Sequence, residues 1–176
     1  MKAFVTSIRK PLDRLYLASG VAASLFLIMI LLLIAAQMLA RWGGAIITGA
    51  PDYTGYCMAA SSFLALPYAL NRDAHIRVSL LLGVLGRYRR YGEIWCFAVG
   101  SYLSVFFAWY AIKSTRESFR FNDISQGQDA SPLWIPQVAM CIGTVILAIA
   151  FIDHLISLLF LGDHNIKEDT LEAHAE

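Results

Sequence analysis

Hydrophobic residues fall into four long stretches that contain no charged side chain, over 15–40, 53–71, 94–112 and 130–152. A helix rises about 1.5 Å per residue, so about 20 residues cross the ~30 Å hydrocarbon core of a bilayer. Apolar residues in the first stretch are consecutive and do not alternate with polar ones, which argues against the strands of a membrane barrel. The pattern therefore predicts an all-α membrane protein with four transmembrane helices at about 15–40, 53–71, 94–112 and 134–160.

Two shorter segments are amphipathic. Residues 76–85 are apolar but too few to cross a bilayer, so we expect a short interfacial helix on the cytoplasmic surface or a shallow re-entrant segment. Phe4, Ile8 and Leu12 recur at every fourth position among basic neighbours, which predicts a second surface helix ahead of the first span. Pro11 suits the first turn of a new helix, so it favours a break between this segment and the span.

Composition and charge narrow the class of protein. Apolar and aromatic residues make up 58% of the chain, more than a soluble core of this size uses, and the net charge is +1. A net charge this small does not provide the positive surface that a nucleic-acid-binding protein needs. We expect a single membrane domain over 1–161, with a mobile acidic cytoplasmic tail over 162–176.

The distribution of basic residues predicts the orientation. Ten of the 14 Lys and Arg residues lie in the N-terminal segment, in the connection between the second and third stretches, or in the tail. The positive-inside rule therefore places both termini in the cytoplasm. Trp42 and Trp134 are then expected at the outer interface, and the basic cluster at 87–91 is expected to contact phospholipid headgroups.

No ionisable residue lies in the middle of any stretch, whereas transporters and pumps place coupling groups there. Cys57, Cys96 and Cys141 occur singly in three stretches and lack the paired spacing of a metal or redox site. No catalytic grouping of residues is visible. We therefore expect no metal, no cofactor and no enzymatic activity in this chain.

Small residues mark one face of the third stretch. Gly100, Ser104 and Ala108 are four residues apart, so they line one side of a helix. Helices in lipid associate where small residues let them approach closely. This face can pack the chain's own helices or receive a larger membrane partner.

Four motifs at the ends of the stretches resemble those of the small membrane subunit, the Q-type or DctQ-like subunit, of tripartite ATP-independent periplasmic (TRAP) transporters. The resemblance extends over roughly 12–161. The motifs are Gln37-Met-Leu-Ala-Arg41-Trp42, His75-Ile-Arg-Val-Ser-Leu-Leu81, Glu93-x-Trp95, and Asp123-x-Ser125-x-Gly127 followed by Pro132-Leu-Trp-Ile-Pro136-Gln137. Two positions depart from the family: Asp52-Tyr53 stands where an acidic pair is frequent, and Ser79 stands where Asp is frequent.

The resemblance implies a scaffold subunit of a sodium-coupled transporter in the bacterial inner membrane. Sodium and substrate would bind a large many-helix subunit, and a periplasmic substrate-binding protein would deliver an organic anion such as a carboxylate. The alternative is a four-helix membrane anchor of a haem or quinone redox complex. Candidate residues for the subunit interface are Arg41, Arg72, His75, Arg77, Gly100, Ser104, Ala108 and Asp153, and those for the periplasmic face are Arg116, Arg120, Asp123 and Trp134.

Two of these groups carry a specific hypothesis. Asp153 lies 19 residues after Trp134, which brings it to the depth of Arg72, His75 and Arg77. We expect a carboxylate–guanidinium pair there that orients 76–85, and the alternative is that these arginines bind anionic headgroups. On the other side, Lys113, Arg116 and Arg120 are expected to continue the third helix beyond the membrane, as a contact for the delivery protein or as a simple connector.

Overall fold

A computed structural model describes residues 2–72, 89–127 and 130–161, and these residues form four helices. The helices are α1 (Lys2–Trp42), α2 (Ala50–Asn71), α4 (Arg89–Phe121) and α5 (Trp134–Leu161). The all-α architecture is thus confirmed for this part of the chain. The predicted surface segment 76–85 and the predicted mobile tail 162–176 lie outside the described residues.

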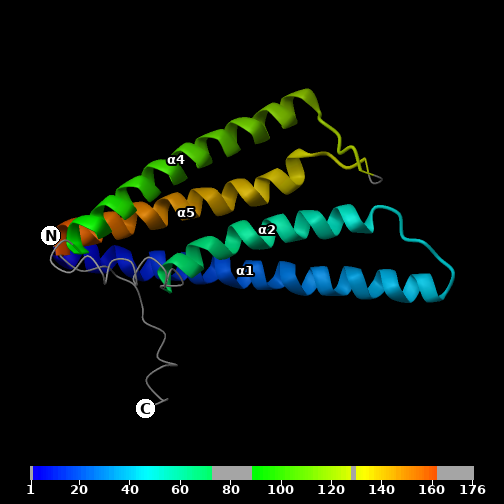
Figure 1. Cartoon of the computed structure of the whole chain (residues 1–176), viewed down its shortest axis with the longest axis horizontal. Helices are drawn as coiled ribbons and strands as arrows, with labels where there is room; N and C mark the ends of the chain where they lie inside the picture. The colour runs from blue at the N-terminus through cyan, green and yellow to red at the C-terminus, as the bar shows by residue number, and fades with distance from the viewer. Residues whose placement is uncertain (1, 73–88, 128–129, 162–176) are drawn as a thin grey trace, which may run out of the picture.

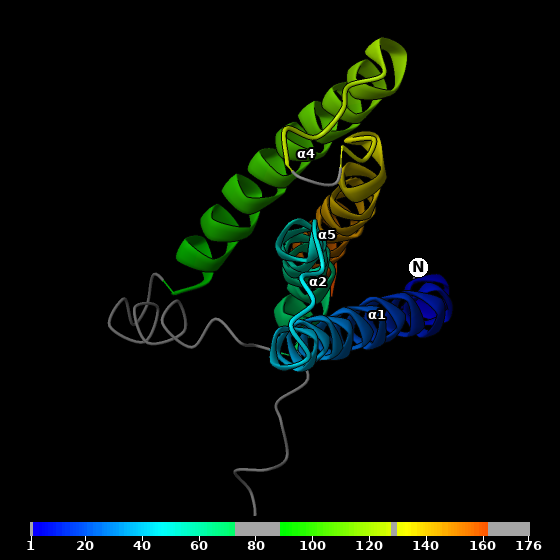
Figure 2. The same cartoon turned by 90° about the vertical axis from the view of Figure 1, so that its right-hand side faces the viewer.

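The helices form one curved row in the order α1, α2, α5, α4 (Figures 1 and 2). α2 packs along α1 and α5, and α5 packs along α2 and α4, so α1 and α4 are the end helices of the row. We call the end with the N-terminus of α1 and the C-terminus of α5 the terminal end. The opposite end, with the α1–α2 and α4–α5 connections, is the loop end.

α1 is one continuous helix, which corrects the prediction of a separate surface helix before the first span. The helix runs from Lys2 to Trp42 with Pro11 inside it. A proline removes one backbone hydrogen bond and usually bends a helix at that point. Lys10, Leu12 and Arg14 around it are good helix formers, so the helix continues through the proline.

Three helices are long and apolar enough to cross a membrane. Their segments are Pro11–Trp42, Tyr91–Phe121 and Trp134–Leu159, and an 18-residue stretch within each has a mean hydropathy of 2.7, 1.5 and 2.3, respectively. Among the described helices, α2 does not meet this criterion. It contains Thr, Ser, Tyr and Pro residues, and its buried positions include Ser61, Pro67 and Asn71. Because α2 lies between two other helices, several of its small and polar residues, such as Ala60, Ser61 and Asn71, are buried against protein.

A glycine allows close approach at each of the three helix contacts in the row. A Cβ at Gly20 of α1 would lie 2.8 Å from Cγ of Tyr68 in α2. A Cβ at Gly143 of α5 would lie 2.7 Å from the backbone of Phe63 in α2. The α4–α5 contact has Gly100, described below. Close backbone approach over small residues is a main source of helix association in lipid.

Candidate functional site

In the α4–α5 connection at the loop end, the described residues on its two sides, 122–127 and 130–133, are joined by backbone hydrogen bonds. Asn122 has a positive φ of 51° directly after α4 ends. The Ser125 amide donates to the Ser131 carbonyl at 2.8 Å, and the Leu133 amide donates to the Asp123 carbonyl at 2.9 Å. These bonds give the turn the form of a short antiparallel bridge. The backbone of the motif that begins at Asp123 therefore holds the two sides of the connection together.

The same turn is tied to the start of α2. The Tyr56 hydroxyl donates a hydrogen bond to Ser125 Oγ at 2.6 Å, and Ser125 Oγ also accepts from the Gly127 amide at 3.2 Å. The Asp52 carboxylate lies against Gly127, where a Cβ would come within 2.5 Å of Asp52 Oδ2. Two segments about 70 positions apart thus form one surface at the loop end.

The four candidates for the periplasmic face all lie at this loop end. Arg116 and Arg120 are exposed in the last turns of α4, and Asp123 is exposed in the turn. The Trp134 ring packs edge-on against Phe119, with 5.5 Å between the ring centroids. The prediction that the third helix continues through residues 113–120 is confirmed, since α4 ends at Phe121.

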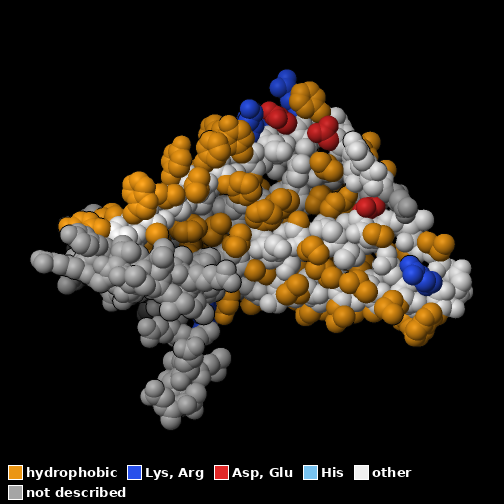
Figure 3. All heavy atoms as spheres, in the orientation of Figure 1, with side chains coloured by type: hydrophobic (Ala, Val, Ile, Leu, Met, Phe, Trp, Pro, Cys, Tyr) orange, Lys and Arg blue, Asp and Glu red, His pale blue; other side chains and the backbone are white. Residues whose placement is uncertain are grey.

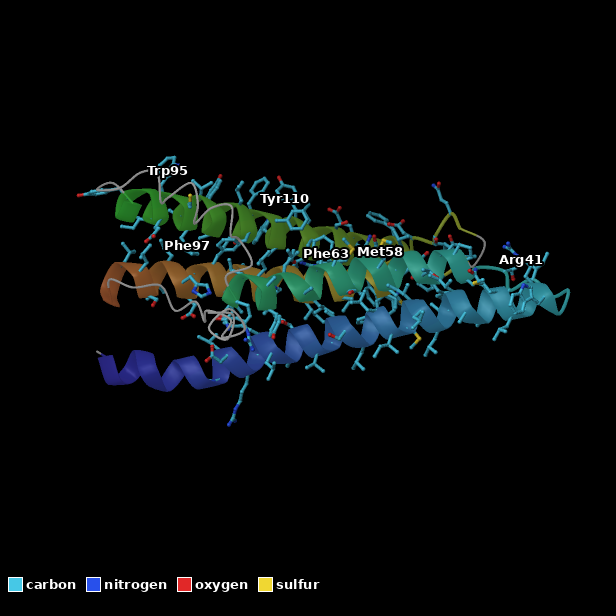
Figure 4. The ribbon with its side chains drawn as sticks, turned by 60° about the horizontal axis from the view of Figure 1, so that its bottom comes forward. Arg41, Met58, Phe63, Trp95, Phe97 and Tyr110 are labelled. Carbon is cyan, nitrogen blue, oxygen red and sulfur yellow. The ribbon has the colours of Figure 1, made fainter. Side chains whose placement is uncertain are left out.

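An ion pair on α4 and an arginine on α1 also lie at the loop end. Lys113 and Glu117, one turn apart on α4, form an exposed ion pair with 3.9 Å between Nζ and Oε1. Arg41 is exposed in the last turn of α1, at the loop end of the row (Figure 4). Trp42 follows it and is 81% exposed. Both predicted anchoring tryptophans, Trp42 and Trp134, are therefore at the same end of the molecule.

At the terminal end, Tyr16 joins three helices. Its side chain is 1% exposed and forms a core cluster with Leu70 of α2 and Ala150 of α5. Its hydroxyl has no hydrogen-bond partner among the described residues. Asp13 and Asp153 are the carboxylates close to this hydroxyl. The sequence predicted that Asp153 lies near the terminal end. It did not predict that the Tyr16 side chain would be buried there between α1, α2 and α5.

Arg72 caps the C-terminus of α2 at the same end. Its guanidinium lies 5.4 Å from the centroid of the Tyr68 ring. Together with Asp13, Arg14 and Asn71 it lines a small hollow between α1 and α2. His75 and Arg77 lie outside the described residues, so the pairing of Asp153 with an arginine stays a prediction.

The small-residue face of α4 is turned toward α5. A Cβ at Gly100 would lie 2.5 Å from Cε1 of Phe151, and Ser104 and Ala108 are each 7% exposed. Ser104 Oγ is bonded back to the Ser101 carbonyl at 3.1 Å. Of the two interpretations left open by the sequence, these contacts agree with packing inside the chain.

The sequence did not predict that several polar residues near the terminal end are buried, although Glu93 is part of one of the motifs. Glu93 of α4 is 8% exposed, and His154 and Ser157 of α5 are 0% and 2% exposed. The His154 ring packs on Phe97, with 5.8 Å between centroids. The spacing of Ala150, His154 and Leu158 at every fourth residue could have placed this histidine on the buried face of its helix.

The chemistry of the described residues is that of packing and surface recognition. The charged side chains of the described residues lie outside the four uncharged stretches, and the space-filling view shows apolar side chains along much of the visible surface (Figure 3). Within the described ranges no group of three or more His, Cys, Asp or Glu residues is arranged to hold a metal ion. The fold and its surface define a multi-pass membrane protein whose polar contacts lie at its two ends and between its helices.

The sequence model of the family described as "Tripartite ATP-independent periplasmic transporters, DctQ component" matches residues 30–161. The match covers about three quarters of the chain, and the protein belongs to this family. The predicted resemblance is thereby confirmed, and the function class is transport. Neither a curated protein nor a solved structure matches the chain.

Proposed function

We propose that this chain is the small scaffold subunit of a sodium-coupled transporter of the bacterial inner membrane. A large many-helix subunit would bind sodium and the substrate, and a periplasmic binding protein would deliver an organic anion, most simply a carboxylate. Membership of the DctQ family supports a role inside a tripartite transporter. The redox-anchor alternative has no support from the family.

The scaffold role is assigned on one observation: the middle of each predicted span contains no Asp, Glu, Lys, Arg or His residue. Coupling a sodium gradient to the movement of an anion requires polar or charged groups at membrane depth. In this chain the charged groups of the described residues lie outside the middle of each predicted span, and Gly20, Gly100 and Gly143 lie at contacts between helices. Binding and coupling are therefore assigned to the large subunit.

We assign α2 as the fourth transmembrane helix. Its 22 residues rise about 33 Å, enough to cross the hydrocarbon core. Its position between α1 and α5 buries Ser61 and Asn71 against protein, and the exposed Ser62 hydroxyl is bonded to the Met58 carbonyl, so α2 does not need an entirely apolar composition. Four spans leave both termini on one side, and the excess of basic residues favours the cytoplasm for that side.

Reconstitution tests this proposal. Liposomes would contain this chain alone, the large subunit alone, or both, with a sodium gradient and a loaded binding protein outside. We expect uptake of the labelled anion with both subunits and none with this chain alone. Uptake by this chain alone would refute the scaffold role. Failure of the tagged chain to copurify with any large membrane subunit would refute its place in a tripartite transporter.

A further inference from the structure

The outward face of α4 carries a continuous aromatic surface. Trp95, Tyr102 and Trp109 follow one another at seven-residue intervals, with exposed fractions of 71%, 70% and 70%. Phe106 and Tyr110 lie on the same face, and the Phe106 ring is 4.7 Å from Tyr110. Figure 4 shows Trp95 and Tyr110 pointing away from the other helices, whereas Phe97 lies between α4 and α5. We call the five exposed residues the aromatic face.

The opposite face of α4 is already occupied. Gly100, Ser104 and Ala108 lie against α5, so α4 turns its small residues inward and its largest residues outward. α4 is also an end helix of the row, with α5 as its main neighbour among the described helices. The described helices consequently leave the aromatic face uncovered.

The depth of the aromatic face in the membrane decides whether lipid headgroups or a protein can accept its hydrogen bonds. Lys113 and Glu117 form an exposed ion pair on the part of α4 that is expected beyond the membrane, so the stretch within the bilayer is 94–112, with its midpoint near residue 103. Tyr102 lies next to that midpoint, whereas Trp109 and Tyr110 lie six and seven residues from it, or about 9 and 10 Å along the axis. Their phenol and indole groups are hydrogen-bond donors, and none of the hydrogen bonds between described residues involves them.

Lipid tails provide no acceptor for such donors, so a phenol or indole held in hydrocarbon loses its hydrogen bond to water without replacement. Tyrosine and tryptophan exposed to lipid are instead enriched at the headgroup level. A side chain near the midpoint is about 15 Å from either headgroup region, which exceeds the reach of a tyrosine. A protein partner with accessible oxygen atoms meets this need.

α1, the other end helix, gives an internal comparison. Its outward positions near the middle are aliphatic and 54% to 66% exposed, and they carry no donor: Leu25, Leu27, Ile28, Leu31 and Leu32. That surface is suited to lipid tails. The two ends of the row thus differ in chemistry although both are apolar.

We propose that the aromatic face of α4 is the surface that the large transporter subunit covers, with an oxygen acceptor on that subunit receiving the hydrogen bond of the Tyr102 hydroxyl. Aromatic side chains bury about 150–250 Å² each, so five at these exposures provide on the order of 500–800 Å². A standard interface buries about 800 Å² per partner. This inference rests on the proposed function, because it takes the large subunit as the occupant.

Site-specific photo-crosslinking in cell membranes tests the surface. Benzoylphenylalanine would replace Tyr102, Phe106 or Trp109 on α4 and, as matched positions on α1, Leu25, Ile28 or Leu32. We expect an adduct with the mass of this chain plus the large subunit from the α4 positions and none from the α1 positions. Adducts from α1 only, adducts with a second copy of this chain, or α4 adducts with lipid alone would each overturn the inference.

A second experiment tests the donor. Tyr102→Phe removes the hydroxyl near the midpoint and keeps the ring, and Tyr53→Phe on α2 is the control for loss of an exposed hydroxyl. We expect Tyr102→Phe to copurify about fivefold less large subunit than wild type, as loss of one hydrogen bond of about 1 kcal/mol would give, and Tyr53→Phe to match wild type. Equal recovery by both variants and wild type overturns the assigned role of the Tyr102 hydroxyl. If wild type copurifies with the large subunit but the α4 positions give no adduct, this inference fails while the proposed function stands. If wild type does not copurify with a large subunit, the proposed function itself fails.

Discussion

Gly100 of α4 lies directly under the ring of Phe151 of α5, so closely that a single added methyl group would come within 2.5 Å of the ring edge. The ring of Phe151 is in turn held by Phe97, with 6.4 Å between centroids. This contact fixes which side of α4 faces the rest of the chain. It thereby also fixes which side of α4 is left for a partner.

Gly100→Ala is expected to destabilise the protein by about 1–3 kcal/mol, because Phe151 has to move and the helices separate. Gly55→Ala on α2 is the control, since no atom lies within 4 Å of a Cβ there. That control should be neutral or stabilising by about 0.5–1 kcal/mol. Thermal unfolding in detergent measures both, and adding Phe151→Leu to Gly100→Ala should restore part of the loss. Equal melting temperatures for Gly100→Ala and Gly55→Ala would contradict the close contact.

Tyr56→Phe is expected to loosen the α4–α5 turn, because it removes the hydrogen bond to Ser125 Oγ. A hydrogen bond of this kind contributes about 1 kcal/mol. In a double-mutant cycle with Ser125→Ala, the two effects should overlap by about the same amount. Thermal unfolding gives the energies, and limited proteolysis near Gln126 reports on the turn. Fully additive losses would mean that the two hydroxyls do not interact.

Charge reversal at Arg116 and Arg120 is expected to weaken delivery by the binding protein. Both guanidinium groups are exposed at the loop end, where charge complementarity acts mainly on the rate of association. The concentration of loaded binding protein that gives half-maximal uptake should rise roughly 3–10-fold, and the effect should shrink as salt is added. Lys167→Glu in the tail is the control for net charge. Unchanged uptake kinetics would leave this segment as a connector.

Asp153→Ala is expected to weaken association with the large subunit, because an arginine at the terminal end would lose its carboxylate partner. Arg77→Glu should act in the same direction, and Asp163→Ala in the tail is the matched control. Copurification and the melting temperature in detergent are the measurements, with a several-fold loss of large subunit expected for the two test variants. If Asp153→Ala behaves as wild type in both, the arginines serve the headgroups instead.

The orientation proposed for the four helices predicts opposite sides for Gly127 and Gly162. A reporter that is active only in the cytoplasm should be active when fused after Gly162 and inactive at Gly127, and a periplasmic reporter should give the reverse. Matching activity at both sites would contradict an odd number of membrane crossings between them. The reverse pattern at both sites would invert the orientation.

Much of the candidate site could be predicted from local sequence, but its organisation could not. The helix through 113–120 follows from short-range spacing, and the depth of Asp153 follows from counting residues after Trp134. The contact of Asp52 and Tyr56 with 125–127 could not be predicted, because these segments are distant in sequence and meet only when α2 lies beside α5. The burial of Tyr16 and His154 depends in the same way on neighbouring helices.

The sequence by itself determined that this is an all-α membrane protein of the DctQ family, because long uncharged apolar stretches and short end motifs are local properties of the chain. It did not determine the order of the helices in the row or the direction of each helix face. Within 94–112 of α4 no residue is charged, so hydropathy cannot distinguish the two sides of this stretch. Only the packing of Gly100 under Phe151 turns the small residues inward and leaves the aromatic face outward, since close approach requires that no side chain stand between the two helices.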